Sequence, residues 1–159
     1  MSLISALANV HHQGQFGDFE DKKGDDLLQI SEKKNLLIVQ IVQFKNSKIP
    51  IESIDIDGLK LKDSSLNVAF NENTRMLWNG PKNWLLVSSK KDLIKNISLT
   101  CKETDFAVTD LSHSRAVIEI EGNYVLEVLK KGSPFNFDIL KKNNSINSLY
   151  NNIAFTVDL

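Results

Sequence analysis

The segment Leu36-Leu37-Ile38-Val39-Gln40-Ile41-Val42 decides the fold, because its apolar residues lie on both faces of a pleated strand. Successive side chains of a strand point to opposite faces, so a run of this kind predicts a central strand that is covered on both sides. A second β-rich run, Leu27 to Ser31, precedes it, and Glu32-Lys33-Lys34-Asn35 between the two suits a hairpin turn. The sequence therefore predicts a buried sheet built around the strand Leu36 to Phe44.

Strands and helices alternate along the rest of the chain. The predicted elements are a short helix over Ile51 to Asp57 that follows Pro50 and stops at Gly58, a hairpin of Arg75 to Trp78 with Trp84 to Ser88, a helix over Lys91 to Ile97, a strand pair of Asp105 to Leu111 with Ala116 to Glu121, a helix over Tyr124 to Lys131, a polar loop, and a last strand over Ile153 to Val157. Asn79-Gly80 is a strong turn signal for the first of these strand pairs. This order predicts an α+β fold with antiparallel or mixed sheets, helices on their faces and plait-like repeats.

The strand Ala116 to Glu121 alternates in character. Ala116, Ile118 and Ile120 share one face, and Glu119 and Glu121 share the other. We expect the first face to be buried and the second to be wetter.

The helix Tyr124 to Lys131 has signals at both ends. Asn123 can cap its first turn, and Gly132 with Pro134 ends it. Val125, Val128 and Leu129 form an apolar stripe, which predicts the face that packs on the sheet.

The chain divides into an N-terminal segment with a mobile acidic arm, residues 1–26, and a single α+β domain, residues 27–159. The segment His11 to Asp26 loses apolar periodicity and is rich in Gly and Asp, which is typical of a solvated arm. The remainder has regular turn signals and the usual length of one domain.

Composition excludes several classes of partner. Lys and Arg number 19 against 20 Asp and Glu, and the only arginines are Arg75 and Arg115, so a nucleic-acid-binding surface is not expected. No run approaches the roughly 18 apolar residues of a membrane span, and the first residues lack the basic region of a signal peptide. The single Cys101 cannot form an internal disulfide. These features predict a cytoplasmic protein.

Several groups could suggest a metal or nucleotide site, and a plainer interpretation is favoured for each. His11-His12 point to different faces of a regular element and have no Cys or His cluster nearby, so we interpret them as loop histidines. Asp55-Ile56-Asp57-Gly58 resembles the opening of a calcium loop, but its glycine comes two positions too early, which favours a helix end and turn. Trp78 and Trp84 could stack on a ligand, although aromatic residues flanking one turn favour core anchors.

The candidate nucleophiles are also better explained without catalysis. Asp110, Ser112 and His113 supply the residue types of a hydrolase triad, but neighbours on one turn diverge, so a turn held by Asp110 and Ser112 is favoured. Cys101 has Lys102 beside it but no local histidine, which favours an inert thiol. No residue is therefore assigned a catalytic, cofactor-binding or metal-ligating role.

Three segments together resemble the γ subunits of heterotetrameric sarcosine oxidase. Gly80-Pro81-Lys82-Asn83-Trp84-Leu85-Leu86 is similar to their Gly-Pro-x-x-Trp-Leu-Leu segment, and Asp110-Leu111-Ser112-His113-Ser114-Arg115 to their Asp-x-Ser-x-x-Arg strand and turn. Gly122 to Pro134 continues the match, and the resemblance extends from about Leu27 to Asp138. The motif positions, which we expect to serve the fold or an interface, are Gly80, Pro81, Trp84, Asp110, Ser112, Arg115, Gly122, Gly132 and Pro134.

The resemblance implies a fold like the folate-binding domain of the glycine-cleavage T-protein. It implies a non-catalytic structural subunit of a complex that demethylates sarcosine to glycine, passes the methyl group to tetrahydrofolate or releases it as formaldehyde, and produces hydrogen peroxide. The partners would be the α, β and δ subunits. FAD, FMN, NAD and tetrahydrofolate would belong to the larger subunits and zinc to the δ subunit, with none in this chain.

Alternatives stay open at this stage. One is a free-standing folate-binding or regulatory protein of the T-protein relatives, and another is a stand-alone enzyme. Dimethylglycine could replace sarcosine as substrate, and the isolated chain could form a homo-oligomer. The family pattern is also expected to continue through another strand and helix, beyond Leu159.

Overall fold

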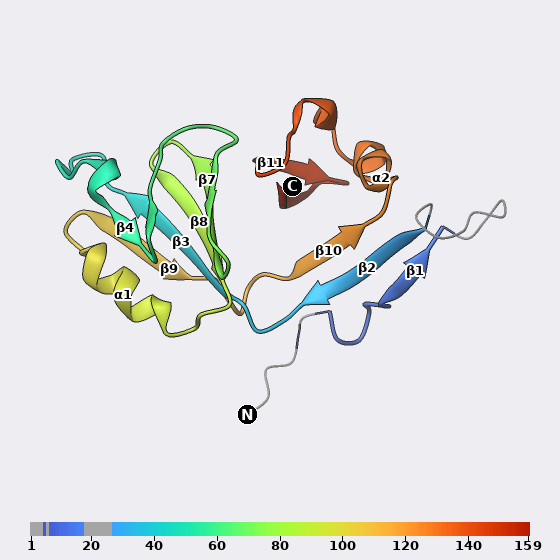
Figure 1. Ribbon diagram of the computed structural model, residues 1–159, viewed down its shortest axis with the longest axis horizontal. Helices are drawn as coiled ribbons and strands as arrows, with labels where there is room; N and C mark the ends of the chain where they lie inside the picture. The colour runs from blue at the N-terminus through green and yellow to red at the C-terminus, as the bar shows by residue number, and fades with distance from the viewer. Residues whose placement is uncertain (1–4, 6, 18–26) are drawn as a thin grey trace.

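The computed structural model describes residues 5, 7–17 and 27–159. At its centre lies a five-stranded antiparallel sheet in the order β6-β7-β8-β3-β9 (Figure 1). Its strands are β3 (Leu37–Gln43), β6 (Val68–Phe70), β7 (Thr74–Gly80), β8 (Asn83–Ser88) and β9 (Phe106–Asp110). One face is covered by the helix α1 (Leu93–Thr100) and by the short hairpin of β4 (Asp55–Ile56) and β5 (Leu59–Lys60), which follows a 3-10 helix, Ile51–Ser53.

The predicted central strand is confirmed. β3 pairs with β8 on one edge and with β9 on the other, and Val39 and Ile41 are 0% exposed on the face that contacts α1. Ile38 on the opposite face is 3% exposed. Burying each such side chain contributes roughly 1.5–3 kcal/mol, so this strand anchors the main core.

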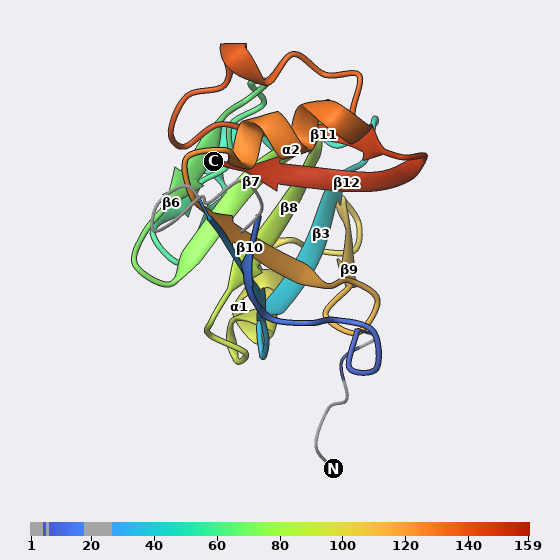
Figure 2. The same cartoon turned by 90° about the vertical axis from the view of Figure 1, so that its right-hand side faces the viewer.

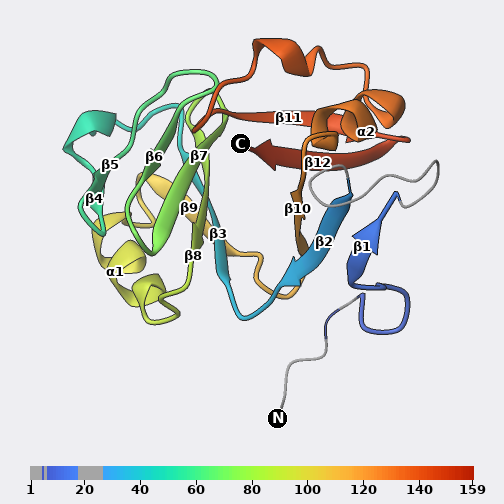
Figure 3. The same ribbon diagram turned by 45° about the vertical axis from the view of Figure 1, so that its right-hand side comes forward.

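A second layer lies against the other face of the sheet. It consists of the hairpin β11 (Ser145–Tyr150) and β12 (Ile153–Asp158) and the helix α2 (Val125–Gly132), and views from the side show the hairpin crossing beside β7 (Figures 2 and 3). The Arg75 guanidinium on β7 forms a two-bond ion pair with Asp158 on β12. A small separate core packs beneath α2 and is formed by Phe137, which belongs to a 3-10 helix (Phe137–Ile139), with Leu140 and Ile146.

A three-stranded antiparallel sheet extends away from the central sheet, in the order β1-β2-β10 (Figure 1). Its strands are β1 (Gly14–Phe16), β2 (Leu28–Lys33) and β10 (Val117–Glu121), and we call it the outer sheet. The strand β1 lies within the segment that the sequence assigns to the N-terminal arm. The acidic residues 18–26 lie outside the described residues, so the mobility of that arm stays a prediction.

Two predicted strand pairings are wrong. The runs at 27–31 and 36–44 form no hairpin with each other, and neither do β9 and β10; instead β2 pairs with β10 and β3 pairs with β9. β2 and β3, which are joined by a bend at Asn35, thus run antiparallel to β10 and β9, respectively. Local turn signals favoured the hairpins, but a strand that is apolar on both faces needs buried neighbours on both edges, and β8 with β9 supply them.

The short helix predicted over Ile51 to Asp57 is also wrong beyond its first turn. After the 3-10 helix, Ile54 and Ile56 are both buried, and this spacing of two suits the extended backbone of β4. The turn predicted at Asn79-Gly80 lies two residues later, at Pro81-Lys82, because Gly80 still pairs with Asn83.

The helices and the remaining strands are closer to expectation. α1 and α2 are confirmed, with α1 ending three residues later than predicted, but Tyr124 rather than Asn123 stands at the N-cap of α2. Ile153 to Val157 is a strand, whereas β6 and β11 were not predicted. Among the described residues, no helix is long and apolar enough to cross a membrane.

Candidate functional site

The Gly-Pro-x-x-Trp segment builds the tight turn between β7 and β8. Pro81 takes the first corner position and Lys82 the second with φ 55°, the positive value that a type II turn requires there. Gly80 has φ 147° and stands at a register shift in the strand pair. Trp84, two residues after the corner, is 1% exposed in the main core, and its indole Nε1 donates to the carbonyl of Lys62 at 2.8 Å. The interpretation of Trp84 as a core anchor is confirmed.

Trp78 lies on the other strand of this turn and is only half-buried. Its indole Nε1 donates to Asp63 Oδ1 at 2.7 Å, and the backbone N–H of Lys82 also points to that carboxylate at 3.3 Å. Asp63 therefore fastens the turn from outside, a contact that no sequence signal indicated.

The Asp110 to Arg115 segment forms the bend where the chain leaves the central sheet for the outer sheet. Asp110 Oδ1 accepts from the backbone N–H of Ser112 at 2.9 Å and from its hydroxyl at 2.6 Å, and these bonds hold the pKa of Asp110 below its usual value. Ser112 Oγ in turn accepts from the backbone N–H of Ile38 at 2.9 Å. Both side chains thus form hydrogen bonds that hold the turn, as predicted. His113 beside them is exposed.

Arg115 lies at the end of this bend and is exposed. Within the described part of the chain it forms no ion pair, whereas the other arginine, Arg75, is paired with Asp158. The structure therefore assigns Arg75 to the fold and leaves Arg115 available at the surface.

The glycines of the third segment permit two close approaches. At Gly122, which has φ 132°, an added Cβ would lie 2.5 Å from the carbonyl oxygen of Leu27. At Gly132 an added Cβ would lie 2.5 Å from the ring of Tyr150 on β11. Gly132 is the last residue of α2, and Pro134 follows two positions later, where the extended Ser133 suits the position before a proline. These three motif positions serve the packing of β2, β10, α2 and β11.

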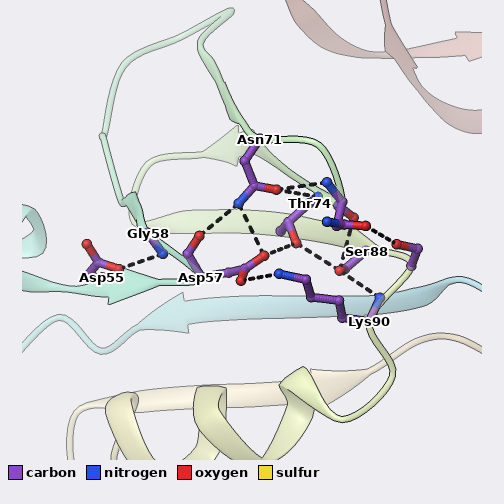
Figure 4. Close-up of polar contacts among 9 residues, drawn as sticks. Asp55, Asp57, Gly58, Asn71, Thr74, Ser88 and Lys90 are labelled. Atoms are coloured by element: carbon purple, nitrogen blue, oxygen red, sulfur yellow. Dashed lines mark hydrogen bonds and ion pairs between the residues drawn. The ribbon is translucent and has the colours of Figure 1, made fainter.

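A polar network surrounds Asp57 in the β4–β5 turn (Figure 4). Its carboxylate accepts from Lys90 Nζ at 2.7 Å, from Thr74 Oγ1 at 2.6 Å and from Asn71 Nδ2 at 3.2 Å. The bond from Lys90 is the main reason that the pKa of Asp57 is lowered, followed by the bond from Thr74. Thr74 Oγ1 lies 2.8 Å from Ser88 Oγ.

This network fastens the β4–β5 turn to the ends of β7 and β8. Thr74 and Ser88 are each 1% exposed, so their hydroxyls are closed to a substrate. Asp55 Oδ1 accepts from the backbone N–H of Gly58 at 2.9 Å. The segment Asp55 to Gly58, which resembles the opening of a calcium loop in sequence, is therefore a hydrogen-bonded turn. The network is therefore structural.

Cys101 ends α1 and is 2% exposed, and burial raises the pKa of its thiol to about 11. A thiol with such a pKa is almost fully protonated near neutrality and is a poor nucleophile. It borders a pocket of about 130 Å³ that is also lined by Phe106 and Glu103. That volume falls below the roughly 300–1,000 Å³ of typical small-molecule sites.

The adjacent histidines do not gather other ligands. His11 is half-buried and His12 is exposed. Within residues 5, 7–17 and 27–159, no group of three or more His, Cys, Asp or Glu side chains could hold a metal ion.

The outer sheet has one apolar and one polar face, because directly opposed residues of an antiparallel pair share a face. The apolar face carries Phe16, Leu28, Ile30, Ile118 and Ile120. The polar face carries Gln15, Gln29, Ser31, Lys33, Glu119 and Glu121, with Val117 at its end.

The expectation that the Ala116, Ile118 and Ile120 face is buried is wrong. Ala116 is exposed, Ile118 is 48% exposed, and Ile120 is only half-buried. Phe16 on the same face is 39% exposed. The alternation itself was correct, but no sequence pattern reveals whether another layer of the same chain covers a strand.

Comparison with known proteins gives a likeness of fold. No protein-family model and no curated protein sequence matches the chain. Among solved structures, a chain of "Heterotetrameric Sarcosine Oxidase from Corynebacterium sp. U-96 in complex with pyrrole 2-carboxylate" is similar, with a TM-score of 0.76 and 22% sequence identity. The likeness covers 86% of this chain and 72% of that chain. The resemblance inferred from the sequence motifs is thus confirmed at the level of the fold: this chain has the fold of a chain in a heterotetrameric sarcosine oxidase.

Proposed function

We propose that this chain is a non-catalytic structural subunit of a heterotetrameric sarcosine oxidase, corresponding to the γ subunit. The observation that carries the proposal is the shared fold over 86% of the chain. The three motif segments support the assignment to the γ subunit, since their glycines, Pro81 and Trp84 lie at positions where the backbone or the core requires them.

The chemistry of the described residues supports a structural role. Asp110 and Ser112 hold a bend, Asp57 holds a turn, and Cys101 is buried with a raised pKa. The side chains that could have served catalysis therefore stabilise the fold instead. We infer that the chain contributes to the complex by stabilising or positioning its partner subunits. Under this proposal the flavins, NAD, folate and zinc belong to the other subunits, and the complex acts in the cytoplasm.

The test is co-expression of the chain with the flavin-bearing subunits of the oxidase from the same organism. We expect the chain to co-elute with them in size-exclusion chromatography with mass determination, at one copy per complex, and to raise their yield or melting temperature. The isolated chain should show no flavin absorbance and no sarcosine oxidation, even after flavin is added. Separate elution at micromolar concentration, with the activity and stability of the larger subunits unchanged, would refute the proposal.

A further inference from the structure

The Asn79-Gly80 pair, which the sequence assigns to a turn, lies at the end of β7 instead. It is the only Asn-Gly pair in the sequence. The strand pairing passes directly from Trp78 opposite Trp84 to Gly80 opposite Asn83. Asn79 therefore has no counterpart on β8 and forms a β-bulge, at which the regular ladder is interrupted.

The side chain of Asn79 is not tied to its surroundings. Asn79 is half-buried, and among the described residues its side-chain amide forms no hydrogen bond. Its backbone carbonyl accepts from Asn147 Nδ2 at 3.1 Å. Gly80 has no side chain, and a Cβ built there would lie 4.0 Å from its nearest neighbour, so nothing crowds the peptide bond that follows Asn79. Water and the Gly80 nitrogen can therefore both approach the Asn79 amide.

We propose that Asn79 is a site of spontaneous deamidation, at which the backbone nitrogen of Gly80 attacks the side-chain amide carbon of Asn79. The new C–N bond closes a succinimide ring, the Gly80 nitrogen loses its proton, and the side-chain nitrogen takes up a proton and leaves as ammonia. Water then opens the ring at one of its two carbonyls and gives aspartate or isoaspartate. Water is the co-reactant, and no oxidation or reduction takes place.

Other asparagines of the described chain differ from Asn79 in the features that favour ring closure. Asn144 and Asn147 are each followed by serine, whose side chain hinders the approach of the backbone nitrogen. The Oδ1 atom of Asn144 accepts from the backbone N–H of Lys141, and that of Asn147 accepts from the Thr156 hydroxyl. These amides must break a hydrogen bond before they can react, so we expect deamidation to be concentrated at Asn79.

Deamidation would alter the junction between the central sheet and the second layer. Isoaspartate carries the main chain through its own side chain, which lengthens the backbone at the bulge, and both products add a negative charge. The Asn79 carbonyl joins β7 to Asn147 on β11, so displacement of this carbonyl should weaken the contact. We expect the modified fraction, separated by ion exchange, to melt at a lower temperature than the unmodified chain.

Peptide mass spectrometry of the full chain tests the proposal. The purified chain is incubated in mildly alkaline buffer and then digested with trypsin. The peptide from Met76 to Lys82 contains Asn79, and the peptide from Asn143 to Leu159 holds five other asparagines and no Asn-Gly pair. We expect the mass increase of an amide converted to an acid in the first peptide, at a rate at least about tenfold higher than in the second.

A matched variant and an unfolded reference make the result specific. Asn79→Gln should show no conversion in its peptide, because the longer side chain closes the ring far more slowly. If Asn79→Gln fails to fold, Asn79→Ser, which has no amide, takes its place. The wild-type chain unfolded in urea gives the rate without the fold, and we expect the folded chain to react within about tenfold of it. A folded chain that reacts more slowly than this, or equal rates in the two peptides, would overturn the proposal.

Discussion

The central sheet and the outer sheet contain neighbouring segments of the chain, β3 with β9 in one and β2 with β10 in the other, but they bury these strands to different degrees. In the central sheet, Val39 and Ile41 are 0% exposed beneath α1. In the outer sheet, which contains β2 and β10, Ile118 is 48% exposed. The comparison teaches that the strand pattern alone does not decide burial, because burial depends on which layers reach each end of the strands. We therefore expect the central sheet, rather than the outer sheet, to be the main source of the chain's stability.

The largest effect on stability is expected at the centre of the main core. Trp84→Ala removes a side chain that is 1% exposed, and such truncations typically cost about 3–5 kcal/mol through lost burial and the cavity left behind. Urea unfolding of the isolated chain measures this loss. The half-buried Trp78→Ala is the control, with a smaller loss expected. Equal losses for the two would show that the central core is not the main source of stability.

A backbone change at the end of the outer sheet should have the next largest effect. Gly122→Ala adds a Cβ 2.5 Å from the Leu27 carbonyl at a residue with φ 132°, and overpacking of this kind costs about 1–3 kcal/mol. Gly58→Ala is the control, since Gly58 has φ 77° but open space around its Cα. Thermal melting compares the two variants. A larger loss at Gly58 would mean that backbone strain, rather than the contact with Leu27, determines the cost.

Removal of the Asp57 charge should destabilise the β4–β5 turn by about 1 kcal/mol, since the carboxylate accepts three side-chain hydrogen bonds. Because the pKa of Asp57 is lowered in the folded chain, its contribution is complete above the usual aspartate pKa of about 4 and is lost as pH falls through the lowered value. Asp57→Asn should therefore flatten the acid limb of the stability curve. Asp92→Asn is the control, because that side chain forms no cap on α1. An unchanged acid limb in Asp57→Asn would show that the network does not contribute.

The smallest effect on the isolated chain is expected at Ile118. Ile118→Ala alters a half-exposed side chain, so the free energy of unfolding should change by no more than about 0.5 kcal/mol. Chemical denaturation provides the measurement. A loss as large as that of Trp84→Ala would mean that Ile118 already packs within its own chain, and the distinction between the two sheets would fail.

The sequence predicted the parts of the fold that local patterns determine. The apolar run at 36–42 gave a central strand, Trp84 proved to be a core anchor, and the two helices lie close to their predicted positions. The pairing of β2 with β10 and of β3 with β9 was missed, because it joins residues about 60 to 90 positions apart and local sequence patterns do not indicate such distant pairings.

Other parts could not be predicted for equally physical reasons. Only half of the residues of β11 are apolar or aromatic, and the strand is held by β12 and by the approach of Tyr150 to Gly132. The bonds of Asp57 join segments from three parts of the chain. Backbone conformation and close packing explain why glycines and Pro81 stand at their motif positions. The role of Arg115 stays a prediction.

The central claim is that the central sheet, rather than the outer sheet, stabilises the chain, and hydrogen exchange followed by mass spectrometry tests it most directly. In the free chain, amides of β3 and β8 should exchange slowly and those of β2 and β10 quickly, since protection follows local packing. Equal protection of both sheets in the free chain would contradict the account.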